Sequence, residues 1–129
     1  MPAVLTVIHA ARHRGECWRR GEACACSLRR DAEAAVLLGV DVTVKPEELS
    51  TNQDFYGEGC GIPTPGGLEA IKRLAESDGV LLDPVYTSKA MAGLIAHVRA
   101  GAIDPGDTIV FLHTGGTPAL FAHAEVLSR

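Results

Sequence analysis

Two short apolar runs, each followed by turn residues and then by a helical pattern, constrain the fold of this chain most strongly. Residues 80–82 read VLL and precede an Asp-Pro pair, whereas residues 108–113 read TIVFLH and precede a Gly-Gly pair. Short continuous apolar runs are typical of strands that are buried on both faces of a parallel sheet. Both runs are therefore predicted to be strands of an α/β fold.

Helical periodicity surrounds both runs. Thr64 is suited to cap a helix that has Pro65 in its first turn, where the missing N–H costs nothing, and that runs to about Ser77. Further helices are predicted over residues 28–38, over about 88–100, and from Thr117 toward the C-terminus. The alternation of helix, strand, helix, strand and helix predicts a three-layer doubly wound α/β sheet.

In sheets of this class, ligands bind at the carboxyl ends of the strands. Here those ends are residues 83–87 (DPVYT) and residues 113–117 (HTGGT), so a small-molecule site is expected to involve both segments. Tyr86 is a candidate acid or base, with a purely structural tyrosine as the alternative. The Gly-Gly turn is a candidate anion site, with a packing turn as the alternative. Lys89 is expected to be a solvated charge.

The composition supports one globular core and argues against polyanions as partners. The chain has 129 residues, of which 47% are hydrophobic and 22% charged, and a net charge of -4. This balance gives no reason to expect nucleic acid or an anionic membrane. No apolar stretch approaches the roughly 20 residues that span a bilayer. The apolar run near the N-terminus precedes its arginines, which is not the order in a signal peptide, so a cytoplasmic location is expected.

Residues 1–27 differ from the rest of the chain. They are rich in Arg, Cys and Ala, follow no helical or strand period, and are expected to be a disordered or non-native segment before the fold at residues 28–129. Cys17, Cys24 and Cys26 are separated by six residues and by one, which is not the usual spacing of zinc ligands, so no metal site is predicted. Free thiols rather than disulfides are expected.

Three motifs resemble those of a known family. A glycine-rich loop, YGEGCGIP, spans residues 56–63, DPVYTSKAMAGLI spans residues 83–95, and HTGGTPAL spans residues 113–120. In this order the motifs resemble the D-cysteine desulfhydrase and aminocyclopropane-carboxylate deaminase family, over about residues 28–126. The resemblance implies a tryptophan synthase β-like fold (fold type II), in which pyridoxal phosphate (PLP) lies between two α/β domains. It also implies a small amino-acid substrate and a homodimer for the full-length parent.

The resemblance implies roles for individual residues. Tyr86 stands at the family's tyrosine near the reacting carbon, and Thr87 or Thr114 lies near the pyridine nitrogen of PLP. Deaminases carry Glu at the position of Thr87 and tend to have Leu at that of Thr114, so both threonines favour a desulfhydrase. A neutral hydroxyl at that nitrogen does not enforce its protonation, which suits β-elimination of sulfide from D-cysteine to give pyruvate and ammonia. Ring opening of 1-aminocyclopropane-1-carboxylate is the alternative.

Three further positions carry over from the family. Gly115 is a cofactor-binding position, and Cys60 and Gly61 belong to the substrate pocket. Cys60 stands where many members have a tyrosine, so D-cysteine is one candidate among related β-substituted amino acids. A nucleophilic role for Cys60 is not expected, because no histidine lies near it in the sequence.

The resemblance also implies that the Schiff-base lysine of the family lies upstream of the matching region, and Lys45, Lys72 and Lys89 do not stand at its position. The chain is therefore expected to be a truncated fragment that is inactive by itself. The alternative is a complete small α/β binding module or accessory subunit. Against it, burying both faces of so few strands needs the rest of a sheet.

Overall fold

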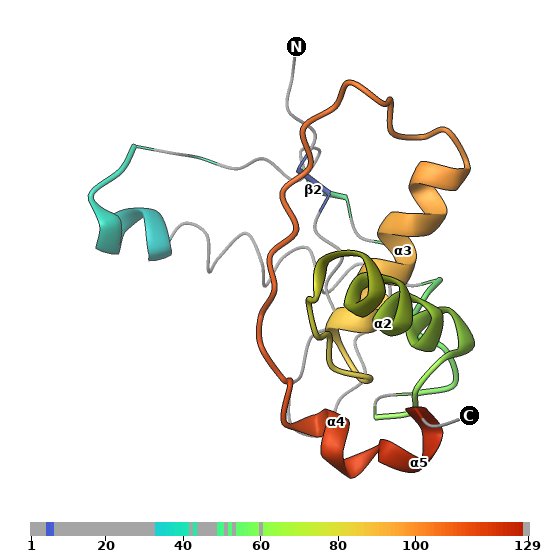
Figure 1. Ribbon diagram of the computed structural model, residues 1–129. Coiled ribbons are helices and arrows are strands. Elements are labelled where there is room, and N and C mark those ends of the chain that lie inside the picture. The colour runs from blue at the N-terminus through green and yellow to red at the C-terminus, as the bar shows by residue number, and fades with distance from the viewer. Residues whose placement is uncertain are drawn as a thin grey trace. The chain divides into compact units, whose positions relative to one another are not determined.

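The computed structural model describes residues 5–6, 33–41, 43, 49–50, 52, 54–59 and 61–127 (Figure 1). The chain divides into two compact units, Met1–Asn52 and Gln53–Arg129, and each is considered by itself. The predicted boundary between residues 27 and 28 lies outside the described residues, as do Cys17, Cys24, Cys26 and Cys60.

The first unit contains a short parallel pair of strands, β1 (Leu5–Thr6) and β2 (Leu49–Ser50), and a helical segment at residues 33–38. Leu5 lies opposite Leu49 in the pair. The helical segment is the described part of the helix predicted over residues 28–38. It ends at Gly39, whose left-handed conformation (φ 63°) is one that glycine adopts without strain.

Two long helices dominate the second unit, α2 (Pro65–Asp78) and α3 (Thr87–Arg99). Thr64 caps α2 as predicted, because its Oγ1 accepts a hydrogen bond from the N–H of Gly67 at 3.1 Å. Gly79 ends the helix in a left-handed conformation with φ 67°. Each bound of the two helices lies within one residue of its prediction.

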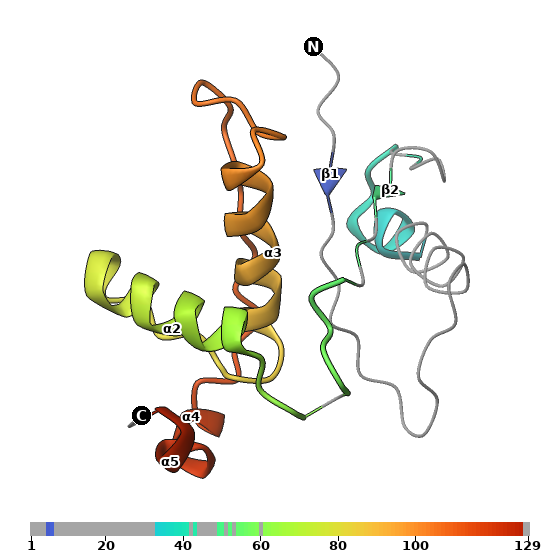
Figure 2. The same ribbon diagram turned by 90° about the vertical axis from the view of Figure 1, so that its right-hand side faces the viewer.

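Gly67 allows α2 to cross α3 closely (Figure 2). A β-carbon on Gly67 would lie 3.0 Å from Ser88 Oγ, whereas one on Gly66 would make an ordinary contact with Ala92 Cβ at 3.5 Å. Ala70 and Ile71 of α2 and Met91 and Ala92 of α3 form the buried core together with Leu82. The core therefore lies at the helix crossing, next to the segment that leads into α3.

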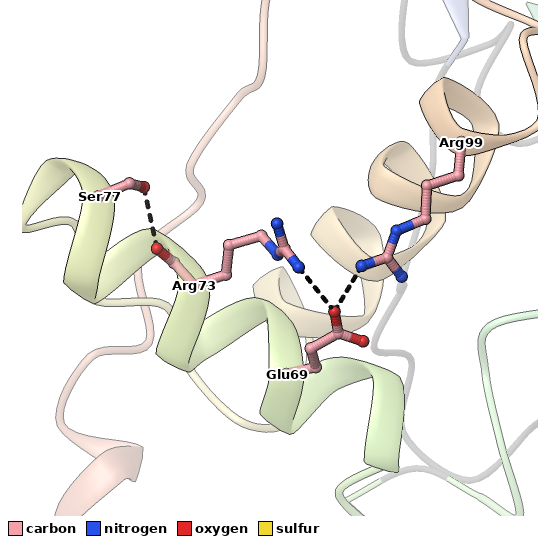
Figure 3. A network of polar contacts seen from close by, with 4 residues as sticks. All are labelled: Glu69, Arg73, Ser77 and Arg99. Atoms are coloured by element: carbon pink, nitrogen blue, oxygen red, sulfur yellow. Dashed lines mark hydrogen bonds and ion pairs between the residues drawn. The ribbon is translucent and has the colours of Figure 1, made fainter.

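An exposed carboxylate links the two helices at the surface (Figure 3). Glu69 Oε1 accepts hydrogen bonds from Arg99 of α3 at 2.6 Å and from Arg73, one turn further along α2, at 3.2 Å. The hydrogen bond from Arg99, followed by that from Arg73, lowers the pKa of Glu69 below its ordinary value. Because these side chains are about half exposed, the network contributes little to stability.

The prediction of two strands is not met in this structure. Residues 80–82 and 108–113 are irregular, so the three-layer doubly wound sheet is absent from the described residues. Figure 1 shows the second run within a long uncoiled segment, drawn in orange. A strand needs a neighbour for its N–H and C=O groups, and within the described part of the chain only β1 and β2 form such a pair.

Part of each run is nevertheless packed. Leu82 is buried and Phe111 lies against the core, whereas Val110 and Leu112 are 87% and 79% exposed. In the second run, exposure is therefore lower at Phe111 than at its two neighbours, as in a strand that is covered on one face. The apolar character of both faces explains why the sequence predicts burial on both sides.

The predicted last helix is divided into two short helices, α4 (Ala119–Ala122) and α5 (Ala124–Leu127), which meet at His123. Among the described helices, none combines the length and the apolar character that crossing a membrane requires.

Candidate functional site

The buried carboxylate of Asp83 organises the segment that enters α3. Oδ1 accepts hydrogen bonds from the N–H groups of Val85 at 2.8 Å and Tyr86 at 2.7 Å. Oδ2 accepts from the N–H of Thr87 at 2.8 Å and from its hydroxyl at 2.6 Å. Asp83 is only 1% exposed, so these donors replace the water that an ionised carboxylate would otherwise bind.

The hydrogen bonds outweigh the burial in their effect on the acidity of Asp83. Burial raises the pKa of this carboxyl, but the bonds from the Thr87 hydroxyl and from the three backbone N–H groups together hold it below its ordinary value of 3.8. Asp83 is therefore ionised at neutral pH and places a negative charge at the N-terminal end of α3.

The hydroxyl of Thr87 is committed to the same aspartate. It donates its proton to Asp83 Oδ2 and accepts the N–H of Asp83 at 2.9 Å. A hydroxyl has one proton and two lone pairs, so Thr87 retains one lone pair and no proton for a ligand. Thr87 is also only 3% exposed.

The two segments that the sequence predicts at strand ends come together in the structure. A β-carbon on Gly116 would lie 2.9 Å from Cβ and Cγ of Asp83 and 3.0 Å from its Oδ2. Gly116 has φ 94° and Gly115 has φ 93°, a region that strains other residues. The HTGGT turn thus packs directly against the DPVYT segment, as expected for the ends of neighbouring strands.

His113 connects this turn to Leu81, the residue before Leu82. Its Nε2 lies 3.0 Å from the carbonyl oxygen of Leu81, and its Nδ1 accepts the N–H of Gly115 at 3.1 Å. The structure also describes two of the predicted site residues. Thr114 is exposed between His113 and Gly115, and Tyr86 is half-buried at the start of α3.

The turn and the neighbouring Thr87 offer few polar groups to a ligand. Thr114 presents an exposed hydroxyl, which can donate or accept, and Thr87 offers one lone pair. The N–H of Gly115 is engaged by His113, and the ionised Asp83 beside Gly116 opposes an anion. The exposed hydroxyl of Thr114 therefore fits a contact with the ring nitrogen of PLP, and the anion role considered for the Gly-Gly turn stays a prediction.

Lys89 corrects one expectation from the sequence. It is 3% exposed rather than solvated, and its Nζ donates to the carbonyl oxygens of Tyr56 at 2.7 Å and Gly59 at 3.0 Å. The ammonium also lies 5.1 Å from the centre of the Tyr56 ring. The sequence signal for the burial of Lys89 was the glycine-rich loop, because the carbonyl groups of a loop outside helices and strands need hydrogen-bond donors. Within this loop, Gly61 has φ 84°, while Cys60 lies outside the described residues.

Relatives of known activity resemble the chain over part of their length. D-cysteine desulfhydrases from Salmonella newport (strain SL254) and Salmonella heidelberg (strain SL476) are each 53% identical over 70 residues, which is 54% of this chain and 21% of the relative. The chain thus matches about a fifth of the length of these relatives. The resemblance predicted from the three motifs is confirmed.

A solved structure supports the same relationship. The crystal structure of an ACC deaminase homologue matches with a TM-score of 0.63 and 38% identity, over 85% of this chain and 32% of that chain. This match confirms the relationship to the tryptophan synthase β-like PLP fold, although the described residues lack its sheet. The model of the pyridoxal-phosphate dependent enzymes matches residues 5–115, well over half of the chain. The chain belongs to the family of pyridoxal-phosphate dependent enzymes.

Proposed function

We propose that the chain is part of a PLP-dependent enzyme that acts on small amino acids, most like a D-cysteine desulfhydrase. The reaction would remove the α proton and the sulfide of D-cysteine, and water would then release pyruvate and ammonia. Bound PLP supplies the electron sink for such an elimination. The observation that carries the proposal is the packing of Gly116 on Asp83, which joins the two segments that bear Tyr86, Thr87 and Thr114.

Within this proposal, each polar side chain has a role that its surroundings permit. Tyr86, half-buried, transfers a proton at the substrate. Thr114, which is exposed, supplies a hydroxyl to the ring nitrogen of the cofactor, and Gly115 adjoins it. Thr87 can only accept there, because its proton is held by Asp83. Gly61, with Cys60, would line the substrate pocket.

The proposal concerns the enzyme of which this chain would form a part, with a homodimer as its assembly. The two described lysines support the expectation that the Schiff-base lysine comes from elsewhere. Lys72 is exposed on α2, and Lys89 is held by the carbonyl oxygens of Tyr56 and Gly59. We therefore propose that the chain alone does not turn over amino acids.

Two experiments test the proposal. First, PLP is titrated into the purified chain, and no visible absorbance band that borohydride removes is expected. Such a band would show that a lysine of this chain binds the cofactor covalently. Second, residues 54–127 replace the corresponding segment of a Salmonella D-cysteine desulfhydrase, and sulfide release from D-cysteine is measured. Replacing Tyr86 by Phe in this chimera is expected to lower kcat by at least about 100-fold.

A deaminase-like ring opening is the second candidate, and the likeness to the ACC deaminase homologue favours it. The same chimera is assayed with 1-aminocyclopropane-1-carboxylate. Turnover of this compound in preference to D-cysteine would favour the deaminase. A T87E variant of the chimera is assayed beside it, because by the resemblance deaminases carry Glu at this position.

A further inference from the structure

The ring of His113 makes two hydrogen bonds that together define its protonation state. The N–H of Gly115 can only donate, so Nδ1, at 3.1 Å, must present a lone pair. The carbonyl oxygen of Leu81 can only accept, so Nε2, at 3.0 Å, must carry the proton. The two partners therefore specify the neutral Nε2–H tautomer.

These two bonds hold the segment that contains Thr114, the residue that the proposed function places near the ring nitrogen of the cofactor. The bond from Gly115 to His113 closes a turn around Thr114, in the way that an aspartate or asparagine side chain closes an Asx turn. The bond to Leu81 fastens this turn to the chain just before Asp83. On the far side of the turn, Gly116 lies against the Asp83 side chain.

We infer that His113 is a positioning residue, which in its neutral Nε2–H form sets the turn at residues 114–116 and thereby the placement of Thr114. The ring does not act on the substrate. It spans the gap between the turn and Leu81, so that the polar groups of the HTGGT and DPVYT segments keep one arrangement. We call the two hydrogen bonds of the His113 ring the clamp. The clamp does not depend on the proposed function, but its consequence for cofactor binding rests on the proposed role of Thr114.

The tautomer can be tested in the unmodified 129-residue chain. Nitrogen-15 NMR is expected to show an unprotonated Nδ1 and a protonated Nε2, with scalar coupling between the Gly115 amide nitrogen and His113 Nδ1 across the hydrogen bond. A protonated Nδ1 in the neutral ring would overturn the inference.

Two substitutions separate the bonds of the ring. H113N retains an acceptor near the position of Nδ1, whereas H113Q retains a donor near the position of Nε2. We expect amide exchange at Gly115 to become about 2- to 10-fold faster in H113Q and to change less than about twofold in H113N. Equal exchange in the two variants would overturn the inference. If H113Q does not fold, the coupling in the unmodified chain decides the question.

The same variants in the desulfhydrase chimera separate this inference from the proposed function. H113Q is expected to raise the concentration of PLP needed for half-maximal activity more than H113N does, because H113N keeps the bond that closes the turn around Thr114 and loses only the bond to Leu81. If the NMR results hold but the unmodified chimera releases no sulfide, the clamp stands and the proposed function fails. If the chimera is active and Gly115 exchange is the same in both variants, only the clamp fails.

Discussion

Gly116 lies so close to Asp83 that a β-carbon on the glycine would be 2.9 Å from both Cβ and Cγ of the aspartate. The contact joins a turn near the C-terminus to the entry of α3. It depends on two properties of glycine, the absence of a side chain and the ease of the φ 94° conformation. The adjoining Gly115 shares the second property only, because nothing lies within 4 Å of its potential β-carbon.

Gly116→Ala is expected to lower the free energy of unfolding by about 3 kcal/mol, because conformational strain and a steric clash add together. Gly115→Ala is the control, and strain alone should cost about 1–2 kcal/mol. Urea denaturation of both variants, followed by circular dichroism, measures the difference. Equal losses would show that the turn moves away from Asp83 without cost.

Thr87 and Ser88 are adjacent residues with buried hydroxyl groups, and removing the two hydroxyls is expected to have different effects on the free energy of unfolding. Thr87→Val removes the hydroxyl bonds to Asp83 and is expected to cost about 1.5–3 kcal/mol of unfolding free energy. Ser88 Oγ is buried with no hydrogen-bond partner in the described structure, so Ser88→Ala should be neutral or stabilising by up to about 1 kcal/mol. Thermal and urea denaturation of the pair provide the test. A larger loss for Ser88→Ala would mean that its hydroxyl has a partner in solution.

Stability is expected to fall in acid because of Asp83. Its pKa in the folded chain lies below the ordinary value of 3.8, so the ionised form stabilises the fold. This contribution is complete above pH 3.8 and is lost as the pH falls through the lower pKa of the folded state. Asp83→Asn lacks this contribution, so the difference in unfolding free energy between the unsubstituted chain and Asp83→Asn should narrow as the pH falls below the ordinary pKa of the aspartate. Urea titrations at a series of pH values measure it, and a constant difference would contradict the assignment.

Lys89 is expected to hold the glycine-rich loop. Lys89→Met retains much of the apolar stem but leaves the carbonyl oxygens of Tyr56 and Gly59 without this donor, which should cost about 1–3 kcal/mol. Amide exchange over residues 54–59 should also accelerate. The control is Lys72→Met at an exposed position of α2, where little change is expected. Unchanged exchange in the loop would show that other contacts hold it.

The features that could be predicted are those that depend on residues close together in the sequence. The Thr64 cap, the end of α2 near residue 78, and the start of α3 follow from hydrogen bonds that span a few positions. The meeting of DPVYT with HTGGT was predicted from the position of each after an apolar run. The two predicted strands do not form within the described residues, because the hydrogen bonds of a strand depend on a neighbouring strand, which no local sequence pattern specifies.

The sequence by itself determined the family and the two long helices, since motifs and caps depend on residue types at short spacing, whereas its candidate site residues stay predictions. Only the tertiary structure decided that Lys89 is buried, that the Thr87 proton belongs to Asp83, and that His113 connects Gly115 to Leu81. The physical reason is that a buried donor or acceptor takes whichever partner the folded chain brings within reach. For Lys89 and His113 that partner lies about 30 residues away in the sequence.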